Sequence, residues 1–351
     1  SVGVYLGTSA IFQILVGPLS DRIGRRTVSL WALIIFSIVS ISCVYAPNTF
    51  VFMFLRALQA IAACTFVVAR AVVRDTTETQ ASGSKIAYIS MGTAICPMFG
   101  PALGGLLDGW FGWEANFWFI GGLGLVILLI AYFDLGETVP ENTQGFRQQF
   151  SEYPELLLSR RFWGYCLASA FGAGAFFAYL GGGPFVGSIV YNLSPEMLGL
   201  YFGAPAIGYF FGNFLSGRFT IRFGIDAMIL WGLWIIFSGL SLSMVCSYIG
   251  YGTVETFFGF MIFVGLGNGL TIPNATAGML SVRPHLAGTA SGLGGAMMIA
   301  IGAALSTLAG AFLVPGSNEM PLLMLMWFSS LSGVAVIIYV GQRNKKLKKS
   351  F

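Results

Sequence analysis

The chain has 351 residues, of which 56% are hydrophobic and 9% charged, with a formal net charge of +4. Soluble domains carry roughly 25% charged residues, so this composition excludes a water-soluble globular protein and indicates a lipid bilayer as the solvent. A helix needs about 20 mostly apolar residues to span a bilayer. Eleven such stretches occur along the chain, at 2–19, 27–46, 50–73, 86–107, 115–133, 162–184, 197–217, 225–249, 254–280, 286–313 and 320–341. Strands of a membrane barrel would run to about 10 residues with alternating polarity, so we predict an all-α integral membrane protein.

A charged loop follows the first span and reads "GPLSDRIGRR" at residues 17–26. Glycines permit a tight turn, and arginines either pair with acids on neighbouring helices or hold the loop in the cytoplasm. One interpretation is a conformational latch on the inner side of the membrane, and the other is a plain positive-inside anchor. The residues concerned are Gly17, Asp21, Arg22, Gly24, Arg25 and Arg26.

The third span contains "FLRALQAIAA" at residues 54–63, which places Arg56 inside the membrane, roughly 9 Å from the outer end at 1.5 Å per residue. A guanidinium in the bilayer is costly, so such residues usually face a cavity and are functional. The alternative is that Arg56 snorkels outward. The same span ends in Arg70, Arg74 and Asp75, which can join the latch.

The fourth span contains "GTAICPMFGPALGG" at residues 92–105. A proline in a helix interior removes a hydrogen bond and bends the helix, and glycines four residues apart let helices pack closely. We therefore predict a kinked, closely packed helix that forms a hinge or a seal. Glycine pairs at the same spacing recur at 208/212, 265/269 and 288/292, and we interpret these mainly as packing positions.

The longest polar stretch, residues 135–161, divides the chain into an N-terminal bundle (1–134) and a C-terminal bundle (162–341) with a basic tail (342–351). The second bundle repeats the charged loop weakly as "SGRFTIRFG" at Ser216–Gly224. Of the 18 Lys and Arg, 17 lie in alternate loops and the tail, which predicts that these segments, including the C-terminus, are cytoplasmic. The chain then starts on the outer side, so we expect one further helix before Ser1 and twelve in total.

With "GLGNGLTIPNATAG" (265–278) and "AGTASGLGG" (287–295), these motifs resemble the major facilitator superfamily, and within it the Bcr/CflA group of drug:proton antiporters, over essentially the whole chain. The resemblance implies two six-helix bundles in a bacterial inner membrane. It implies efflux of amphiphilic drugs or antibiotics, of the bicyclomycin and chloramphenicol type, by alternating access and driven by a proton gradient without a cofactor. It makes 17–26 the latch signature and ties Arg56 to proton coupling. It assigns the antiporter signature to Gly92, Gly100, Pro101, Gly104 and Gly105.

The sequence departs from an antiporter in having no carboxylate in mid-span. The acids near the membrane lie at or near span ends, namely Asp108, Glu114, Asp134, Glu196 and Glu255. The resembled family usually carries its coupling acid on the first helix, so we expect the partner of Arg56 on the helix before Ser1. A symporter or uniporter of a small metabolite stays open as the alternative, because fold does not fix function.

A substrate cavity with aromatic walls would suit lipophilic drugs. Tyr5 and Gln13 lie eight residues apart on one face of the first span, and the second bundle offers Phe171, Phe176, Phe177, Tyr179 and Tyr201. The alternative for these aromatic residues is helix packing or lipid contact. A membrane enzyme and a metal site are not expected, since His285 is the single histidine. We expect a monomer that binds a small-molecule drug and a proton, with "RNKKLKKSF" as a topological anchor and not a nucleic-acid site.

Overall fold

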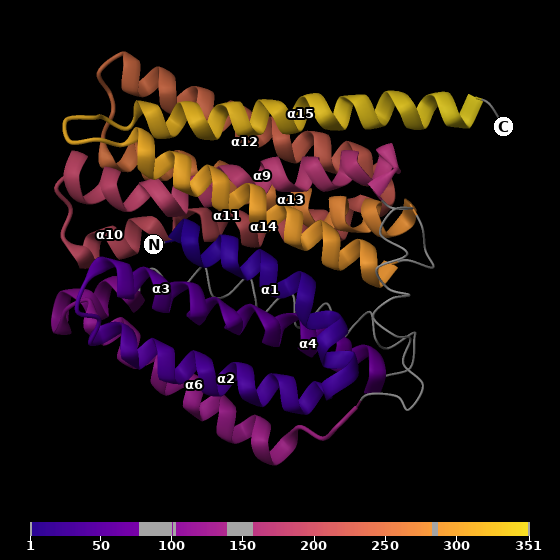
Figure 1. Ribbon diagram of the computed structural model, residues 1–351. Helices are drawn as coiled ribbons and strands as arrows, with labels where there is room; N and C mark the ends of the chain where they lie inside the picture. Colours follow the sequence, from indigo (N-terminus) through magenta and orange to yellow (C-terminus); the bar gives the residue numbers. More distant parts are fainter. Residues whose placement is uncertain (1, 77–99, 101–102, 139–156, 283–286, 350–351) are drawn as a thin grey trace. The chain divides into compact units, whose positions relative to one another are not determined.

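The computed structural model describes residues 2–76, 100, 103–138, 157–282 and 287–349. All regular structure in these ranges is helical (Figure 1). The first part of the chain forms α1 (Val2–Ile23), α2 (Arg25–Val44), α3 (Thr49–Gln59), the 3-10 turn η1 (Ala60–Ala62), α4 (Ala63–Thr76) and α6 (Glu114–Asp134). The second part forms α9 (Arg160–Phe185), the π-helical segment η2 (Val186–Val190), α10 (Pro195–Phe202), α11 (Ala204–Phe223), α12 (Ile225–Tyr248), α13 (Val254–Val282), α14 (Ala287–Phe312) and α15 (Met320–Lys349).

The predicted all-helical membrane fold is confirmed. Among the described residues, eight helices are long and apolar enough to cross a membrane by length and composition. Ten of the eleven predicted spans coincide with helical segments in these ranges. The remaining one, 86–107, falls mostly outside them, and residues 103–111 at its end are helical. The span predicted at 197–217 is divided between α10 and α11 at Gly203, two residues before Pro205, which cannot donate a backbone hydrogen bond.

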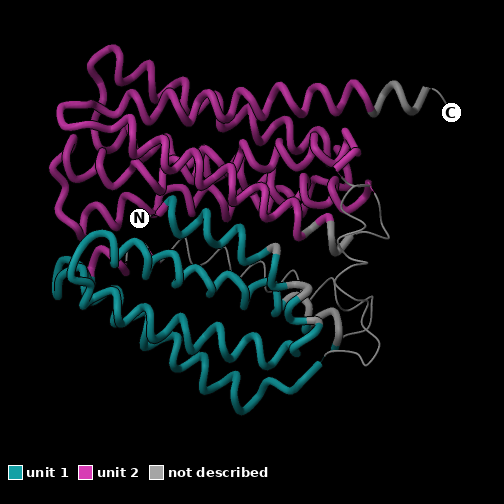
Figure 2. Tube along the Cα trace, in the orientation of Figure 1, with its two compact units in different colours: residues 1, 3–93, 107–153 teal, residues 2, 94–106, 154–351 magenta. Residues whose placement is uncertain are grey.

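The chain divides into two compact units (Figure 2). Residues 3–93 and 107–153 belong to the first, and residues 94–106 and 154–351 belong to the second. In the first unit α2 packs along α6 and against α3 and α4. A small apolar cluster joins α1 to this group through Val16, which lies with Val28, Ala32, Cys64 and Val68. Helix α1 is therefore held to α2 and α4 by side-chain burial.

Helix α13 is the central element of the second unit and contacts α9, α11 and α12, while α9 also packs against α14 and α15. The crossing of α11 and α13 depends on glycine. A Cβ atom at Gly208 would overlap the carbonyl of Ile262, and one at Gly265 would overlap the carbonyl of Pro205. Gly212 and Gly269 face each other one turn further along. The packing interpretation of these two pairs is confirmed, whereas Gly292 has open space beside it.

A single glycine connects two helices at the same place in each unit. Gly24 joins α1 to α2 with φ 108° and ψ 141°, and Gly224 joins α11 to α12 with φ 82° and ψ 157°. The backbone bonds also match, because the Gly24 N–H donates to Ser20 at 3.1 Å and the Gly224 N–H donates to Thr220 at 2.8 Å. The weak sequence echo between the two charged loops therefore corresponds to one repeated turn, whose φ and ψ values only glycine adopts readily.

We expect Gly24→Ala and Gly224→Ala to destabilise the protein, since this backbone region costs other residues about 1–3 kcal/mol. Gly24→Ala should be the worse of the two, because its Cβ would push the Glu137 carboxylate out of its hydrogen bond with the Arg25 N–H, whereas no atom lies within 4 Å of a Cβ at Gly224. Thermal unfolding in detergent measures this difference. Gly217→Ala, in open space inside α11, is the matched control and should be neutral or slightly stabilising. A Gly24→Ala protein as stable as wild type would contradict the prediction.

Candidate functional site

The structure places Arg56 on α3, seven residues after Thr49, where the helix begins, and thus about 10 Å along the axis. The side-chain oxygen of Asn48 accepts a hydrogen bond from the Val51 N–H at 2.9 Å and caps this helix. The Arg56 guanidinium carbon lies 5.0 Å from the ring centre of Tyr5 on α1 and 5.8 Å from that of Phe117 on α6. Two aromatic faces from different helices therefore contact one cation, each worth roughly 0.5–2 kcal/mol in such a setting.

A short chain of hydrogen bonds continues from Arg56 into the unit. Its Nη1 donates to the side-chain oxygen of Gln59, one turn further along α3. The Gln59 amide nitrogen donates to Ser40 Oγ on α2 at 2.7 Å, and Ser40 donates to the Phe36 carbonyl at 2.6 Å. Gln59 is 1% exposed, so it is a buried polar side chain with both ends paired. Residues i and i+3 on a helix are neighbours, and this spacing was the signal in the sequence that could have identified Gln59.

The guanidinium has no acidic partner among the residues that the structure describes. The ionisable groups that act on it there are Tyr5 and Cys43, and neither is a carboxylate. Its Nε is buried and has no hydrogen-bond partner in those ranges. An unpaired buried donor on a cation is costly, so this part of the first unit is a positive site with unused capacity for an acceptor. No cluster of three or more metal-ligating side chains occurs in the described part of the chain.

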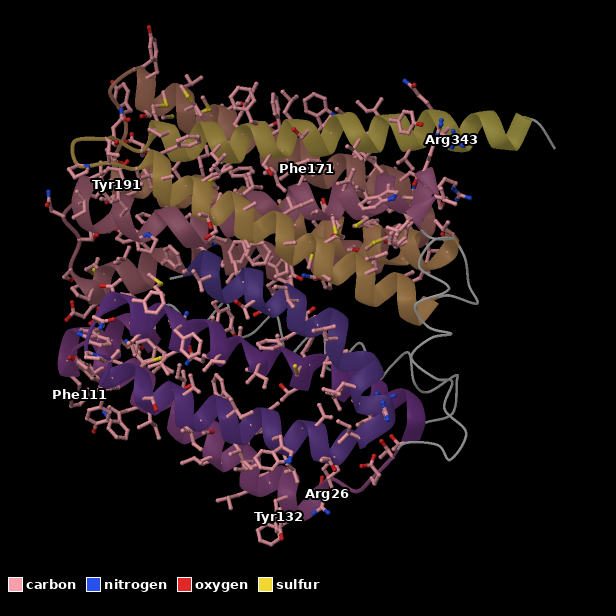
Figure 3. All side chains as sticks on the ribbon, viewed as in Figure 1. Arg26, Phe111, Tyr132, Phe171, Tyr191 and Arg343 are labelled. Atoms are coloured by element: carbon pink, nitrogen blue, oxygen red, sulfur yellow. The ribbon has the colours of Figure 1, made fainter. Side chains whose placement is uncertain are left out.

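The charged loop after α1 forms a second polar cluster, inside the first unit. The backbone N–H of Arg25 donates to Glu137 Oε1 at 2.8 Å, and the buried Arg25 guanidinium donates to Ser20 Oγ. Arg26 donates to the Tyr132 carbonyl at 2.9 Å and lies 5.4 Å from the centre of its ring (Figure 3). Negative charge is favourable at a helix N-terminus, so Glu137 stabilises the start of α2.

Glu137 comes from the segment predicted as a linker, and we did not single it out from the sequence. Among the predicted latch residues, the structure brings Gly24, Arg25 and Arg26 into this cluster and leaves Arg22 exposed. The surroundings of the others lie outside the description, namely those of Gly17, Asp21, Arg70, Arg74 and Asp75. The observed contacts therefore explain how the basic turn is held within the first unit, and the latch itself stays a prediction.

Among the described members of the antiporter signature, Gly105 makes a close contact within the second unit. A Cβ atom at Gly105 would lie 2.5 Å from the Pro195 carbonyl oxygen and 2.9 Å from Gly199 Cα, so this position lies directly against α10. Gly100 has nothing within 4 Å of a Cβ, and Gly104 is half-buried. Gly92 and Pro101 lie outside the described residues. Gly105 is thus the member of the signature for which the structure gives a steric reason.

Most of the aromatic candidates for the substrate cavity contribute to packing in the second unit. Tyr179 is fully buried, stacks on Phe202 with ring centres 4.5 Å apart, and donates its hydroxyl to the Phe202 carbonyl at 3.1 Å. Phe176 lies 6.4 Å from Tyr179, and Phe177 lies against Gly302. Tyr201 packs on Phe258 with ring centres 5.6 Å apart. Tyr179 becomes available to a ligand only if Phe202 moves.

Two further candidates, Phe171 and Gln13, lie outside this aromatic group. Phe171 is half-buried on α9, where its carbonyl accepts a hydrogen bond from Ser329 at 2.7 Å (Figure 3). Gln13 is half-buried on α1. Tyr5 is the candidate that the structure joins to another predicted functional residue, Arg56.

Comparison with known proteins finds one transporter family and several relatives named for drug resistance. The family model "Major Facilitator Superfamily" matches residues 1–307. The chain is 32% identical over 311 residues to a chloramphenicol resistance protein of Pseudomonas aeruginosa, covering 85% of this chain and 72% of that one. It is 26% identical over 349 residues to a bicyclomycin resistance protein homolog of Haemophilus influenzae (96% and 85%). It is 27% identical over 343 residues to multidrug resistance protein D of Escherichia coli (96% and 84%).

A solved structure with the same fold is a bacterial homolog of the human lysosomal transporter Spinster, in an inward-facing and occupied conformation. It aligns with a TM-score of 0.67 at 19% identity and covers 96% of this chain and 86% of that one. At this identity the likeness establishes the fold and carries nothing about the substrate.

We expect Gly105→Ala to lower the stability of the protein by roughly 1–3 kcal/mol, because the new Cβ forces α10 away from the helix that carries Gly105. Gly100→Ala is the matched control from the same motif and should leave stability unchanged, since the space around Gly100 is open. Thermal unfolding of both variants in detergent, beside wild type, gives the comparison. Equal loss in the two variants would show that the close contact at Gly105 is not what constrains this motif.

Proposed function

Because the chain belongs to the major facilitator superfamily, whose family model covers residues 1–307, we propose that it exports amphiphilic drugs in exchange for protons. The chain is a multi-pass membrane transporter and not an enzyme, as its family and its apolar helices establish. Its relatives, named for resistance to chloramphenicol, bicyclomycin and multiple drugs, place it in the Bcr/CflA group. Those names support a drug, and not a nutrient, as the cargo.

The observation that carries proton coupling is the environment of Arg56. Two aromatic rings and Gln59 hold the Arg56 cation at membrane depth, and its Nε has no acceptor among the described residues. Such a cation favours the ionised form of an acid brought next to it. Moving that acid away from the guanidinium removes the stabilisation and raises its pKa, so it takes up a proton. A change between these two arrangements during transport would couple proton movement to drug movement in the opposite direction.

The proposed orientation of the chain in the membrane follows the distribution of charge. We place the basic turns and the C-terminal tail on the cytoplasmic side of a bacterial inner membrane, in agreement with the positive-inside rule. The turn held by Glu137, Arg25 and Arg26 would then lie on the cytoplasmic side. Rearrangement of this turn would accompany opening toward the cytoplasm. We propose that one copy of the chain suffices for the cycle.

The test uses inverted membrane vesicles that contain the protein and carry an acid-inside pH gradient, reported by a pH-sensitive dye. Addition of a chloramphenicol-type or bicyclomycin-type compound should dissipate the gradient. Arg56→Ala should slow this response at least about tenfold at unchanged protein level, equivalent to about 1.4 kcal/mol or more of barrier. Arg56→Lys keeps the charge and should retain part of the activity, and Arg343→Gln removes an arginine at the far end of α15 and should behave as wild type.

Two outcomes would contradict the proposal. Exchange at the wild-type rate by Arg56→Ala would remove Arg56 from the coupling mechanism. Drug movement that neither dissipates the gradient nor depends on it would make the protein a uniporter, whatever the effect of the Arg56 variants.

A second pair of variants separates the ring of Tyr5 from its hydroxyl. Tyr5→Phe keeps the aromatic face 5.0 Å from the guanidinium and should retain most of the exchange rate. Tyr5→Leu removes a cation–π contact worth roughly 0.5–2 kcal/mol and should slow exchange several-fold. The same vesicle assay measures both variants. A large loss in Tyr5→Phe together with a normal Tyr5→Leu would show that the aromatic contact does not position Arg56.

A further inference from the structure

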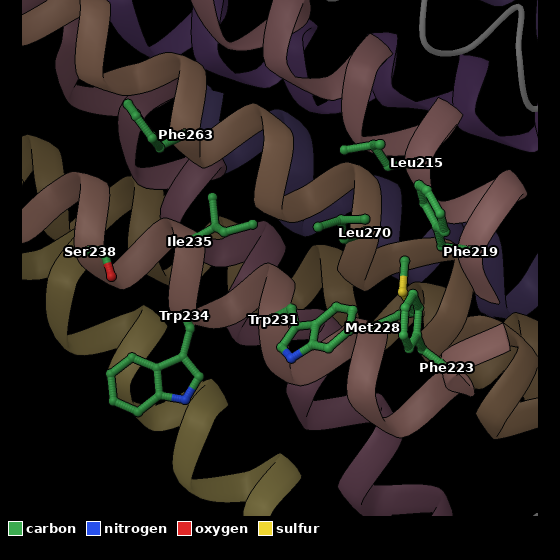
Figure 4. Close-up of a pocket in the computed structure, with 10 residues that line it drawn as sticks. All are labelled: Leu215, Phe219, Phe223, Met228, Trp231, Trp234, Ile235, Ser238, Phe263 and Leu270. Atoms are coloured by element: carbon green, nitrogen blue, oxygen red, sulfur yellow. The ribbon is translucent and has the colours of Figure 1, made fainter.

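An open apolar groove of about 630 Å³ lies among α11, α12 and α13 in the second unit (Figure 4). Its walls combine aromatic and aliphatic side chains and include Phe219, Phe223, Met228, Trp231, Trp234 and Phe263. The two tryptophans are 44% and 43% exposed, so their rings stand open to the medium around the helix bundle. In a bilayer this medium is lipid.

The length of the groove matches one leaflet of a bilayer. Along α12 it extends from Met228 to Ser238, ten residues or about 15 Å. The hydrocarbon core of a bilayer is about 30 Å thick. A groove that begins near the start of α12 therefore extends to about the middle of the membrane and has the dimensions of a lipid chain.

Two arginines lie at the end of this groove that is nearest the start of α12. Arg218 and Arg222 are one turn apart on α11, both exposed, and they share a helix face with the groove residues Leu215 and Phe219. The Arg222 guanidinium carbon lies 5.3 Å from the centre of the Phe223 ring, which itself lines the groove. Neither guanidinium has an ion-pair partner among the described residues. The nearby acid at the start of α12, Asp226, accepts a hydrogen bond from the Tyr165 hydroxyl at 2.7 Å.

We propose that the groove binds an anionic phospholipid from the leaflet on the basic side of the protein. One acyl chain lies along the aromatic walls, and the phosphate contacts Arg218 and Arg222. Guanidinium groups pair with phosphate oxygens through two parallel hydrogen bonds, and basic pockets between membrane helices recognise anionic head groups. The two exposed charges at one end, together with the one-leaflet length, favour this occupant over a drug molecule or a second copy of the chain. This inference does not depend on proton coupling.

The test measures how brominated lipids quench the tryptophan fluorescence of the protein in nanodiscs. Brominated phosphatidylglycerol and phosphatidylcholine are compared at equal mole fraction. The quenching that arises from the groove is the quenching of wild-type fluorescence minus that of the double variant Trp231→Phe/Trp234→Phe. We expect phosphatidylglycerol to quench this signal with an apparent affinity at least about threefold higher than phosphatidylcholine. Arg218→Gln/Arg222→Gln should abolish the preference, and Arg218→Lys/Arg222→Lys should keep most of it because the charge remains.

The matched control is Arg160→Gln/Arg343→Gln, which removes two positive charges elsewhere in the second unit and should leave the preference unchanged. Equal quenching by the two lipids in wild type would overturn the proposal, and so would a preference that survives in Arg218→Gln/Arg222→Gln. Displacement of the brominated lipid by a chloramphenicol-type drug would show that the groove binds a drug instead. Loss of quenching in a dimer detected by light scattering would show that a second copy of the chain covers the groove. Drug–proton exchange in vesicles is measured separately, so a failure here leaves the proposed transport function standing.

Discussion

The cost of keeping one guanidinium at membrane depth governs the arrangement of the first unit. A charge in hydrocarbon needs compensation from its surroundings, and Arg56 receives it from three helices at once. Tyr5 on α1 and Phe117 on α6 supply aromatic faces, while Gln59 continues the contact to Ser40 on α2. The compensation is incomplete, because Nε has no acceptor in the described part of the chain. The Arg56 site therefore suits a hydrogen-bond acceptor that binds and leaves during the transport cycle.

Both units use the same one-glycine turn to connect two successive helices. Gly24 and Gly224 each reverse the chain in one residue at positive φ and start the next helix. The side chains around the two turns differ. In the first unit the Glu137 carboxylate accepts from the Arg25 N–H, and in the second the Asp226 carboxylate at the start of α12 accepts from Tyr165. The repeated turn therefore belongs to the fold, whereas its charged surroundings are specific to each unit.

Glycine and aromatic residues divide the packing between them in the second unit. Gly208 and Gly265 bring the backbones of α11 and α13 together, and rings such as Phe258 and Tyr179 belong to the buried core of the same unit. On the surface of α12, Trp231 and Trp234 remain partly exposed. The second unit therefore has both a closely packed helix crossing and, among α11, α12 and α13, an apolar groove on its surface next to two exposed arginines.

The sequence by itself determined the helical spans, because a helix in lipid satisfies its own hydrogen bonds and needs only enough apolar length. It also singled out Arg56, since the cost of a charge in a span can be judged from one position, and the glycine pairs, whose spacing of four places both members on one helix face. The tertiary structure alone decided what these residues touch. Glu137 reaches the Arg25 N–H across 112 residues of chain, Phe117 reaches Arg56 from another helix, and Tyr179 turns out to be packed under Phe202. Apolar length and spacing are local properties of a chain, whereas such pairings depend on how whole helices cross, which no local pattern of residues encodes.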